Sequence, residues 1–251
     1  MSVSFDLTGR AALVTGANTG IGQAIAVALA QAGADVALAG RSEPAETLEL
    51  IARTGRTAVS IAADLSSIEP VGRVIDAALA GLGRLDILVN NAGIIRRNDL
   101  ADFTEDDWDA VIDTNLKSLF FLSQAAARVM VAQGRGKIIN IASLLSFQGG
   151  VRVPSYAAAK SGVAGVTRAM ANELAAKGVQ VNAIAPGYIT TNNTVALQAD
   201  AGRARQILER IPAGRWGDPA DIAGAAVFLA GPASDYVTGH VLAVDGGWLA
   251  R

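Results

Sequence analysis

The sequence contains no cysteine and a single histidine, His240. The lack of cysteine excludes disulfide bonds, thiolate nucleophiles and metal sites with cysteine ligands. One histidine excludes a site with several histidine ligands, and a serine–histidine–aspartate triad would have to use His240. We expect His240, which precedes the last predicted strand, to be structural or to lie at an interface. The sequence therefore predicts no metal centre, and its chemistry must depend on tyrosine, lysine, serine, carboxylates or a bound cofactor.

An excess of charge of either sign is also lacking. The chain has 21 Lys and Arg against 23 Asp and Glu, a formal net charge of −2. Without a basic run there is little to neutralise a phosphate backbone, so nucleic acid is not an expected partner. The uncharged stretch 11–34 is broken by Thr15, Asn18 and several glycines, which argues against a membrane span. No cleavable signal pattern follows, and we expect a cytoplasmic protein.

Short apolar segments alternate with longer segments of helical period. The predicted strands are Ala11–Val14, Asp35–Ala39, Ala58–Ala62, Asp86–Val89, Lys137–Ile141, Gln180–Ile184 and Val241–Val244. The predicted helices are Gly22–Ala32, Glu43–Arg53, Ile68–Leu82, Glu105–Gln133, Tyr156–Lys177 and Pro219–Leu229. Nearly continuous apolar strands are typical of a parallel sheet buried on both faces. We predict an α/β fold over residues 1–251: a single Rossmann-type domain whose doubly wound, parallel, seven-stranded sheet has helices on both faces. An insertion at about 188–213 would lie at the carboxyl ends of the strands, where ligands bind.

A glycine-rich turn follows the first predicted strand and opens a helix. Its candidate binding residues are Gly16, Asn18, Thr19, Gly20, Ile21 and Gly22. Glycines allow a sharp turn and let a pyrophosphate approach backbone N–H groups without a Cβ in the way. The spacing departs from the common dinucleotide fingerprint, and tight packing alone is the alternative. The context of strand, turn and helix favours a dinucleotide.

Further polar groups follow the other strands of the same half. Asn91, Ala92 and Gly93 end the fourth strand, and Asp64 ends the third, where it could accept a hydrogen bond from an adenine amino group. Each is more often a turn or a cap when it stands alone. The second strand is followed by Arg41 instead of the carboxylate that usually binds the ribose 2′-hydroxyl. Arg41 could pair with a 2′-phosphate, which favours NADP, or could be an ordinary exposed arginine.

Tyr156 and Lys160 are four residues apart on a predicted helix, so their side chains share a face. A free tyrosine has a pKa near ~10, and a nearby ammonium group favours the phenolate. Ser143 follows the fifth strand, where its hydroxyl can hold a carbonyl oxygen. The pattern of Tyr156 and Lys160 alone is weak, because a surface tyrosine beside an aliphatic lysine stem looks the same. Ser143 strengthens this pattern as a candidate acid–base group.

These motifs together resemble the short-chain dehydrogenase/reductase family over essentially the whole chain. The resemblance rests on residues 15–22 and 90–93, Asn115, Ser143, residues 156–160, Pro186 and Gly187. It implies that Tyr156 exchanges the substrate proton, that Ser143 orients the substrate, and that Lys160 holds the nicotinamide ribose. Asn115 would then hold a water molecule that links Lys160 to solvent. The implied NAD(P) contacts extend to Leu65, Tyr156, Lys160, Pro186, Gly187 and Ile189.

The segments around the predicted cleft resemble those family members that act on deoxy-keto sugar acids in uronate and pectin breakdown. Such members are usually described with NAD, in conflict with Arg41, so the choice between NAD and NADP stays open. A sugar acid needs cations for its carboxylate, which Arg97 and Arg152 could supply, and hydroxyl partners such as Gln148, Thr191 and Asn193. Either arginine could instead be solvated or at a subunit contact. The resemblance also implies a homotetramer.

Other readings remain. A 3-oxoacyl-carrier-protein reductase, or a gluconate or polyol dehydrogenase, could use the same scaffold. A non-catalytic dinucleotide-binding regulator would be expected to lack Tyr156, Lys160 or Ser143, and all three are present.

Overall fold

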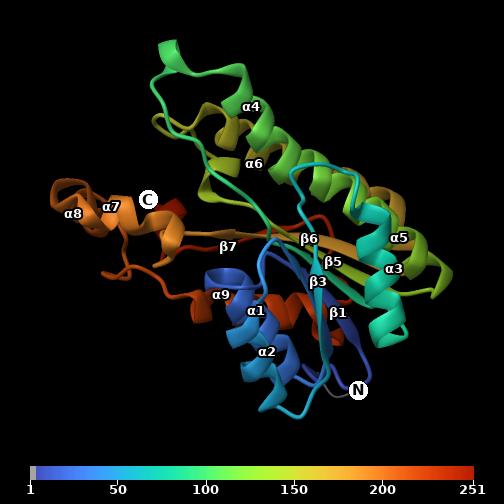
Figure 1. The fold of residues 1–251 in the computed structure, drawn as a ribbon. Coiled ribbons are helices and arrows are strands. Elements are labelled where there is room, and N and C mark those ends of the chain that lie inside the picture. The colour runs from blue at the N-terminus through green and yellow to red at the C-terminus, as the bar shows by residue number, and fades with distance from the viewer. Residues whose placement is uncertain (1–3) are drawn as a thin grey trace.

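The computed structural model describes residues 4–251, apart from the side chains of Asn193 and Ala196. Its centre is a seven-stranded sheet in the order β3-β2-β1-β4-β5-β6-β7, and all neighbouring strands in it are parallel. The strands are β1 (Ala11–Thr15), β2 (Asp35–Gly40), β3 (Ala58–Ala62), β4 (Ile87–Asn90), β5 (Gly136–Ile141), β6 (Val179–Pro186) and β7 (Val241–Val244) (Figure 1). The predicted sheet is confirmed, with strands close to their predicted bounds.

Helices cover both faces of this sheet. The helices α1 (Gly20–Gln31), α2 (Ala45–Ala52) and α9 (Pro219–Ala230) lie on one face, and α3 (Val71–Leu82), α5 (Ser118–Ala132) and α6 (Pro154–Leu174) lie on the other (Figure 1). Successive strand residues point to opposite faces, so Val14 packs in the core under α1 and α9 while Leu13 packs under α3 and α5. The apolar cores on both faces of the sheet are buried, as expected from the nearly continuous apolar strands.

The strand order reverses between β1 and β4, which pair with each other although β2 lies on the other side of β1. At the carboxyl ends of these strands, Thr15 Oγ1 accepts hydrogen bonds from the backbone N–H groups of Asn91 and Ala92, at 3.0 and 2.9 Å. The side chain of Asn91 donates in turn to the carbonyl oxygens of Thr15 and Gly16. The two loops are therefore held together where a crevice opens in a doubly wound sheet.

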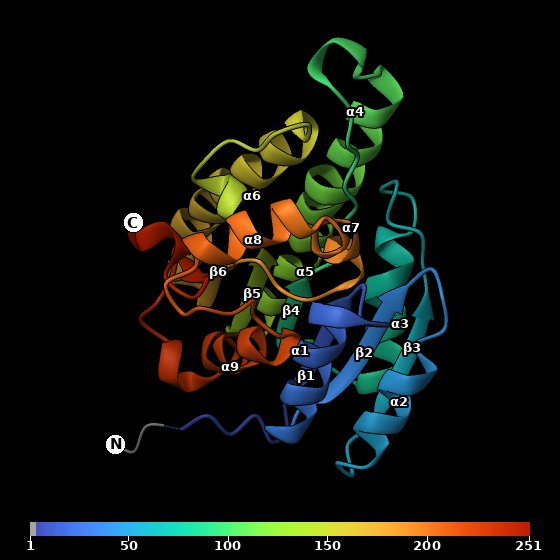
Figure 2. The ribbon, with the colours of Figure 1, turned by 90° about the vertical axis from the view of Figure 1, so that its left-hand side faces the viewer.

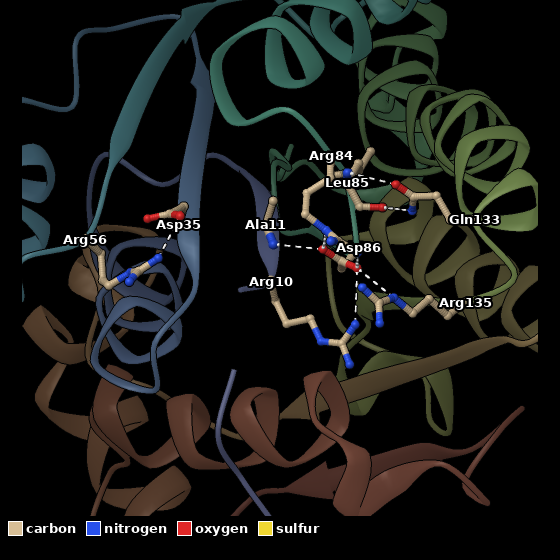
Figure 3. A network of polar contacts seen from close by, with 9 residues as sticks. All are labelled: Arg10, Ala11, Asp35, Arg56, Arg84, Leu85, Asp86, Gln133 and Arg135. Carbon is tan, nitrogen blue, oxygen red and sulfur yellow. Dashed lines mark hydrogen bonds and ion pairs between the residues drawn. The ribbon is translucent and has the colours of Figure 1, made fainter. Parts of the chain in front are cut away.

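A cluster of arginines fixes the opposite edge of the sheet (Figure 3). Asp86, just before β4, is 3% exposed. It accepts from Ala11 N at 3.0 Å and from both Arg84 nitrogens at 2.6 and 2.7 Å, and it pairs with Arg135 and Arg10. Burial raises the pKa of Asp86, but the hydrogen bonds and positive charges outweigh burial, so its pKa lies below the usual value. The cluster ties β1, β4 and β5 together away from the ligand-binding edge.

The helix predicted over 105–133 is wrong in one respect. The structure divides it into α4 (Glu105–Ile112), a π-helical turn (Asp113–Lys117) and α5. A π-helical turn admits one extra residue and turns its side chains away from the positions of a regular α-helix, and such turns are frequent at functional sites. Asn115 lies in this turn.

The segment after β6 folds into short helices. They are a 3-10 turn (Asn192–Thr194), α7 (Val195–Ala199) and α8 (Ala201–Arg210). Figure 2 shows α7 and α8 passing in front of the carboxyl ends of the central strands. Over residues 4–251, none of the helices has the length and apolar character that a membrane crossing requires.

Candidate active site

A cavity of about 650 Å³ lies over the carboxyl ends of β1, β2, β3 and β4. Most of the predicted cofactor residues line it: Gly16, Asn18, Thr19, Gly20, Ile21, Gly22, Arg41, Asp64, Leu65, Asn91, Ala92 and Gly93. Thr191, expected at the substrate, lines the same cavity. Segments that are far apart in the sequence thus meet at the edge predicted for ligand binding.

The shape of the glycine-rich turn suits a dinucleotide pyrophosphate. Gly16 and Gly20 have φ angles of 64° and 58°, which side-chain-bearing residues rarely adopt. A Cβ on Gly22 would overlap the carbonyl oxygen of Gly16 and the amide of Asn91. The turn leads directly into α1, whose N-terminal N–H groups and helix dipole favour a phosphate group. The residues present therefore fit NAD(P).

The end of β2 offers a cation to the cofactor cavity. Arg41 and Ser42 line the cavity, and Asn18 Nδ2 donates to Ser42 Oγ at 3.0 Å. Asp64 also lines it and accepts from the Ser66 N–H at 2.9 Å. That hydrogen bond, and the charge of Arg41, hold the pKa of the Asp64 carboxyl below its usual range. A 2′-phosphate at this end of the cavity would meet Arg41.

A second cavity, of about 140 Å³, contains Ser143, Tyr156 and Lys160 together. Pro186, Gly187 and Ile189 line it as well, as do Asn91 and Gly93 from the cofactor cavity. The predicted serine, tyrosine and lysine thus come together at the expected position. The cofactor cavity and the cavity of the catalytic candidates therefore share part of their lining.

Lys160 is buried, with 4% exposure. Its Nζ lies 5.5 Å from the centre of the Tyr156 ring and donates to the carbonyl oxygen of Ile141 at 2.5 Å. Burial lowers the pKa of Lys160 to about 8, because the buried ammonium group has lost water. The lysine can therefore gain or lose a proton near neutral pH.

The pKa of Tyr156 has opposing causes. Burial raises it, the hydrogen bond with Ser143 and the charge of Arg97 lower it, and the net direction is upward. The sequence assigned the lowering charge to Lys160 and did not foresee the contribution of Arg97. A bound nicotinamide cation beside the ring would add a further positive charge that favours the phenolate.

Asn115 lies in the π-helical turn and is buried. Its Oδ1 accepts from the N–H of Ile94 at 2.8 Å, and its Nδ2 donates to the Ile94 carbonyl oxygen at 2.8 Å. Because Ile94 follows Gly93, Asn115 fixes the loop that ends β4 and borders the cofactor cavity. This contact was not foreseen from the sequence.

A third cavity, of about 410 Å³, opens beside Ser143 and Tyr156. Arg97 and Gln148 line it, as predicted for substrate binding. Arg152 is absent from its described lining, and its Nε pairs with Asp99 Oδ1 at 2.9 Å. The structure therefore does not bring Arg152 to the substrate cavity, which corrects the prediction. The side chain of Asn193, also predicted there, lies outside the described residues.

Helix α8 contributes a wall of the third cavity that was not predicted from the sequence. Arg203, Gln206, Ile207 and Arg210 line the third cavity, and Trp248 lines it from the C-terminal end of the chain. The spacing of these α8 residues is that of one helix face. This spacing was the signal that could have found them. No Asp or Glu occurs among the described residues that line the cavity.

The sheet is doubly wound, a glycine-rich turn lies where its strand order reverses, and Tyr156 lies beside the buried Lys160. Together these features define an NAD(P)-dependent oxidoreductase that acts on CH–OH groups. Residues 16–249 match the family model described as enoyl-(acyl carrier protein) reductase. The chain belongs to the short-chain dehydrogenase/reductase family.

Relatives and solved structures match over the full length. The chain is 59% identical to 2-dehydro-3-deoxy-D-gluconate 5-dehydrogenase of Escherichia coli, covering 99% of this chain and 98% of that protein. A candidate 2-deoxy-D-gluconate 3-dehydrogenase of Agrobacterium tumefaciens, solved with NADP, is 62% identical with a TM-score of 0.92 and complete coverage of both chains. A gluconate 5-dehydrogenase of Burkholderia cenocepacia, solved with NADP and tartrate, is 42% identical, with a TM-score of 0.95 and coverage of 99% and 98%.

Proposed function

We propose that this protein interconverts a secondary alcohol and a ketone on a deoxy-keto sugar acid, of the 2-dehydro-3-deoxy-D-gluconate type, in uronate or pectin catabolism. The observation that carries this proposal is the charge of the third cavity. Arg97, Arg203 and Arg210 line it, and its described lining contains no carboxylate. A small anionic substrate satisfies that imbalance, whereas a neutral polyol does not. The full-length similarity to a sugar-acid dehydrogenase points to the same class.

Each catalytic candidate has a role that its surroundings support. Tyr156 exchanges a proton with the reacting hydroxyl, and Ser143, hydrogen-bonded to it, holds the substrate oxygen. Lys160 supplies a buried positive charge near the Tyr156 ring and binds the nicotinamide ribose. The bound dinucleotide supplies or accepts the hydride at the nicotinamide ring.

Asn115 keeps the loop after β4 in place through both of its hydrogen bonds to Ile94. The same side chain lies near Gly93, where a Cβ would meet Asn115 Oδ1 at 3.1 Å. We propose that a water molecule beside Asn115 carries the proton between Lys160 and solvent. Arg97 favours the phenolate of Tyr156, and it therefore assists the oxidation direction by stabilising the base form.

NADP is the proposed preference. Arg41 and Ser42 line the cavity at the end of β2, and the solved relatives from Agrobacterium and Burkholderia were crystallised with NADP. In an Arg41→Asp variant, the ratio of kcat/KM with NADP to kcat/KM with NAD is expected to fall more than tenfold, because a charge-assisted contact contributes roughly 1.5–3 kcal/mol. An unchanged NADP preference would refute the role of Arg41.

The decisive experiment is a steady-state screen of five- and six-carbon sugar acids with NAD and NADP in both directions, followed by nicotinamide absorbance. A sugar acid is expected to exceed both a neutral polyol and a 3-oxoacyl thioester in kcat/KM. A 3-oxoacyl thioester as the best substrate would instead assign the chain to acyl-carrier reduction. Absence of turnover with every compound would favour a binding protein.

The proposal includes a homotetramer in the cytoplasm. The resemblance to the family supports the assembly, and dependence on a dinucleotide that cells keep inside supports the location. Light scattering coupled to size-exclusion chromatography tests the assembly, and a mass of one or two chains would refute it.

A further inference from the structure

Arg210 has no carboxylate partner among the described residues, in contrast to three arginines outside the lining of the third cavity. Arg96 pairs with Asp107, Arg152 with Asp99, and Arg215 with Asp221. Arg210 is the last residue of α8, lines the cavity, and appears in none of the ion pairs of residues 4–251. Its counter-ion is therefore not supplied by the described protein.

The guanidinium of Arg210 is nevertheless held in one place. Its Cζ lies 4.0 Å from the centre of the Trp248 ring, and its Nη2 is 3.4 Å from Gln148 Oε1. Trp248 is only 4% exposed and packs against Tyr188 with ring centres 4.7 Å apart. An arginine stacked on an indole keeps its in-plane N–H donors available for a carboxylate while it loses little freedom on binding.

An apolar cluster beneath α8 packs this helix, and with it Arg210, against the segment that follows Ser143. Ile207, on the same helix face, is buried in an apolar cluster with Leu144, Ile211 and Trp248. Leu144 directly follows Ser143, so this cluster fixes α8 relative to the proposed catalytic serine. Arg203 lies about two helical turns earlier, and among the described hydrogen bonds its side chain reaches only Gln206 of the same helix. Arg210 is consequently the better ordered cation of α8.

Arg97 is poorly suited to the same task. Its charge lowers the pKa of Tyr156, which places it at the proton-transfer end of the cavity. A substrate carboxylate bound there would cancel that charge and raise the pKa of the base. A carboxylate remote from the reacting carbon avoids this cost by pairing with Arg210.

We propose that Arg210, positioned by Trp248 and Gln148, binds the substrate carboxylate and determines the preference for sugar acids over neutral sugars. This inference rests on the proposed function. Trp248 is a positioning residue, because it acts through the guanidinium that it stacks on. The segment 201–210 is then the part of the chain that distinguishes an acid from a neutral ketone.

The test compares Arg210→Met with Arg205→Met, a matched change on α8 at an exposed arginine outside the described lining of the cavity. Arg210→Met is expected to lower kcat/KM for the sugar acid about 100-fold, mainly through KM, and to change that for an uncharged ketone less than threefold. Arg205→Met should leave both unchanged. Arg210→Lys is expected to recover part of the loss, since it restores the charge without the two-pronged geometry. Trp248→Leu should raise KM for the acid and spare kcat.

A binding measurement separates failure of this inference from failure of the proposed function. D-gluconate is titrated calorimetrically into protein saturated with NADPH, a pair that cannot react because both are reduced. Wild-type binding that Arg210→Met abolishes supports the inference even if no sugar acid is turned over. Equal affinity in wild type and Arg210→Met, equal losses for acid and neutral ketone, or no wild-type binding at all would overturn it.

Discussion

Replacing Lys160 by methionine should make the protein more stable at neutral pH while it removes activity. The pKa of Lys160 is about 8, against 10.5 for an unburied lysine. A difference of about 2.5 corresponds to a cost of about 3 kcal/mol for keeping the buried ammonium charged. Methionine avoids this cost but leaves the Ile141 carbonyl oxygen without its donor, which costs about 1 kcal/mol. The net gain is about 2 kcal/mol, or roughly 4 °C in Tm for a chain of this size.

The gain must also depend on pH in one direction. Below pH 8 both the folded and the unfolded lysine carry a proton, so the wild type bears the full cost. Between pH 8 and 10.5 the folded lysine has lost its proton while the unfolded lysine still binds one, so wild-type stability rises with pH. The advantage of Lys160→Met should therefore be complete at pH 7 and shrink steadily above pH 8.

Urea unfolding of wild type and variant from pH 7 to 9.5 measures this difference. Lys137→Met is the matched control: Lys137 is also buried, but it pairs with Asp235 at 2.7 Å. Burial lowers the pKa of Lys137 and Asp235 opposes that effect, so its removal should yield a smaller gain. A Lys160→Met variant less stable than wild type at pH 7, or an advantage that does not fall with pH, would refute the argument.

Three further predictions concern single residues. Tyr156→Phe should abolish turnover and leave dinucleotide affinity within about twofold, since it removes only the hydroxyl that moves the proton. Rate assays and dinucleotide titration measure the two effects, and surviving activity would contradict the prediction. Gly22→Ala should weaken NADP binding more than tenfold, because the added Cβ would overlap the Gly16 carbonyl oxygen and the Asn91 side chain that hold the glycine-rich turn in shape. An unaltered Kd would contradict the role of this turn in binding the dinucleotide. Asp86→Asn should cost about 3 kcal/mol in urea unfolding, whereas Asp35→Asn, at a more exposed pair with Arg56, should cost less than about 1 kcal/mol (Figure 3).

The sequence predicted the sheet because its signal is strong and local. Strands buried on both faces are mostly apolar, as the runs Ile87–Val89 in β4 and Ile138–Ile139 in β5 show, although Lys137 and Asn140 of β5 are buried as well. The cofactor cavity was also predictable, since it forms from strand ends whose position follows from the topology. Its glycines have a steric reason that the structure shows directly.

The π-helical turn that contains Asn115 was not predictable in the same way. The turn consists of residues 113–117, Asp-Thr-Asn-Leu-Lys, and nothing in this composition distinguishes it from the regular helix predicted over 105–133. The hydrogen bonds of Asn115 to Ile94 join segments separated by most of a helix and a loop. Only the packing of α4 against α6 and of α5 against the sheet decides which polar side chain of this segment reaches Ile94.

Arg152 and Arg210 show why the substrate side was predicted less well. Arg152 is close to Tyr156 in the sequence, yet its backbone has a φ angle of 64° and its side chain pairs with Asp99, outside the described lining of the substrate cavity. Arg210 is remote in sequence, and α8 folds back to place it in the cavity. Sequence distance from the catalytic tyrosine was therefore a poor guide.

The overall charge of −2 could not reveal the charge of the substrate cavity. A net charge near zero argues against partners that need a large basic surface, such as nucleic acid, because those require many cations at once. A small carboxylate requires only a local imbalance. In this chain the local imbalance follows from where the carboxylates form ion pairs. Asp86 pairs with arginines at the opposite edge of the sheet, Asp99 pairs with Arg152, and Asp221 pairs with Arg215. Arg203 and Arg210 are left facing a cavity whose described lining contains no carboxylate. Partner selection by charge is thus decided by which ion pairs the fold forms, and a count of charged residues cannot supply that information.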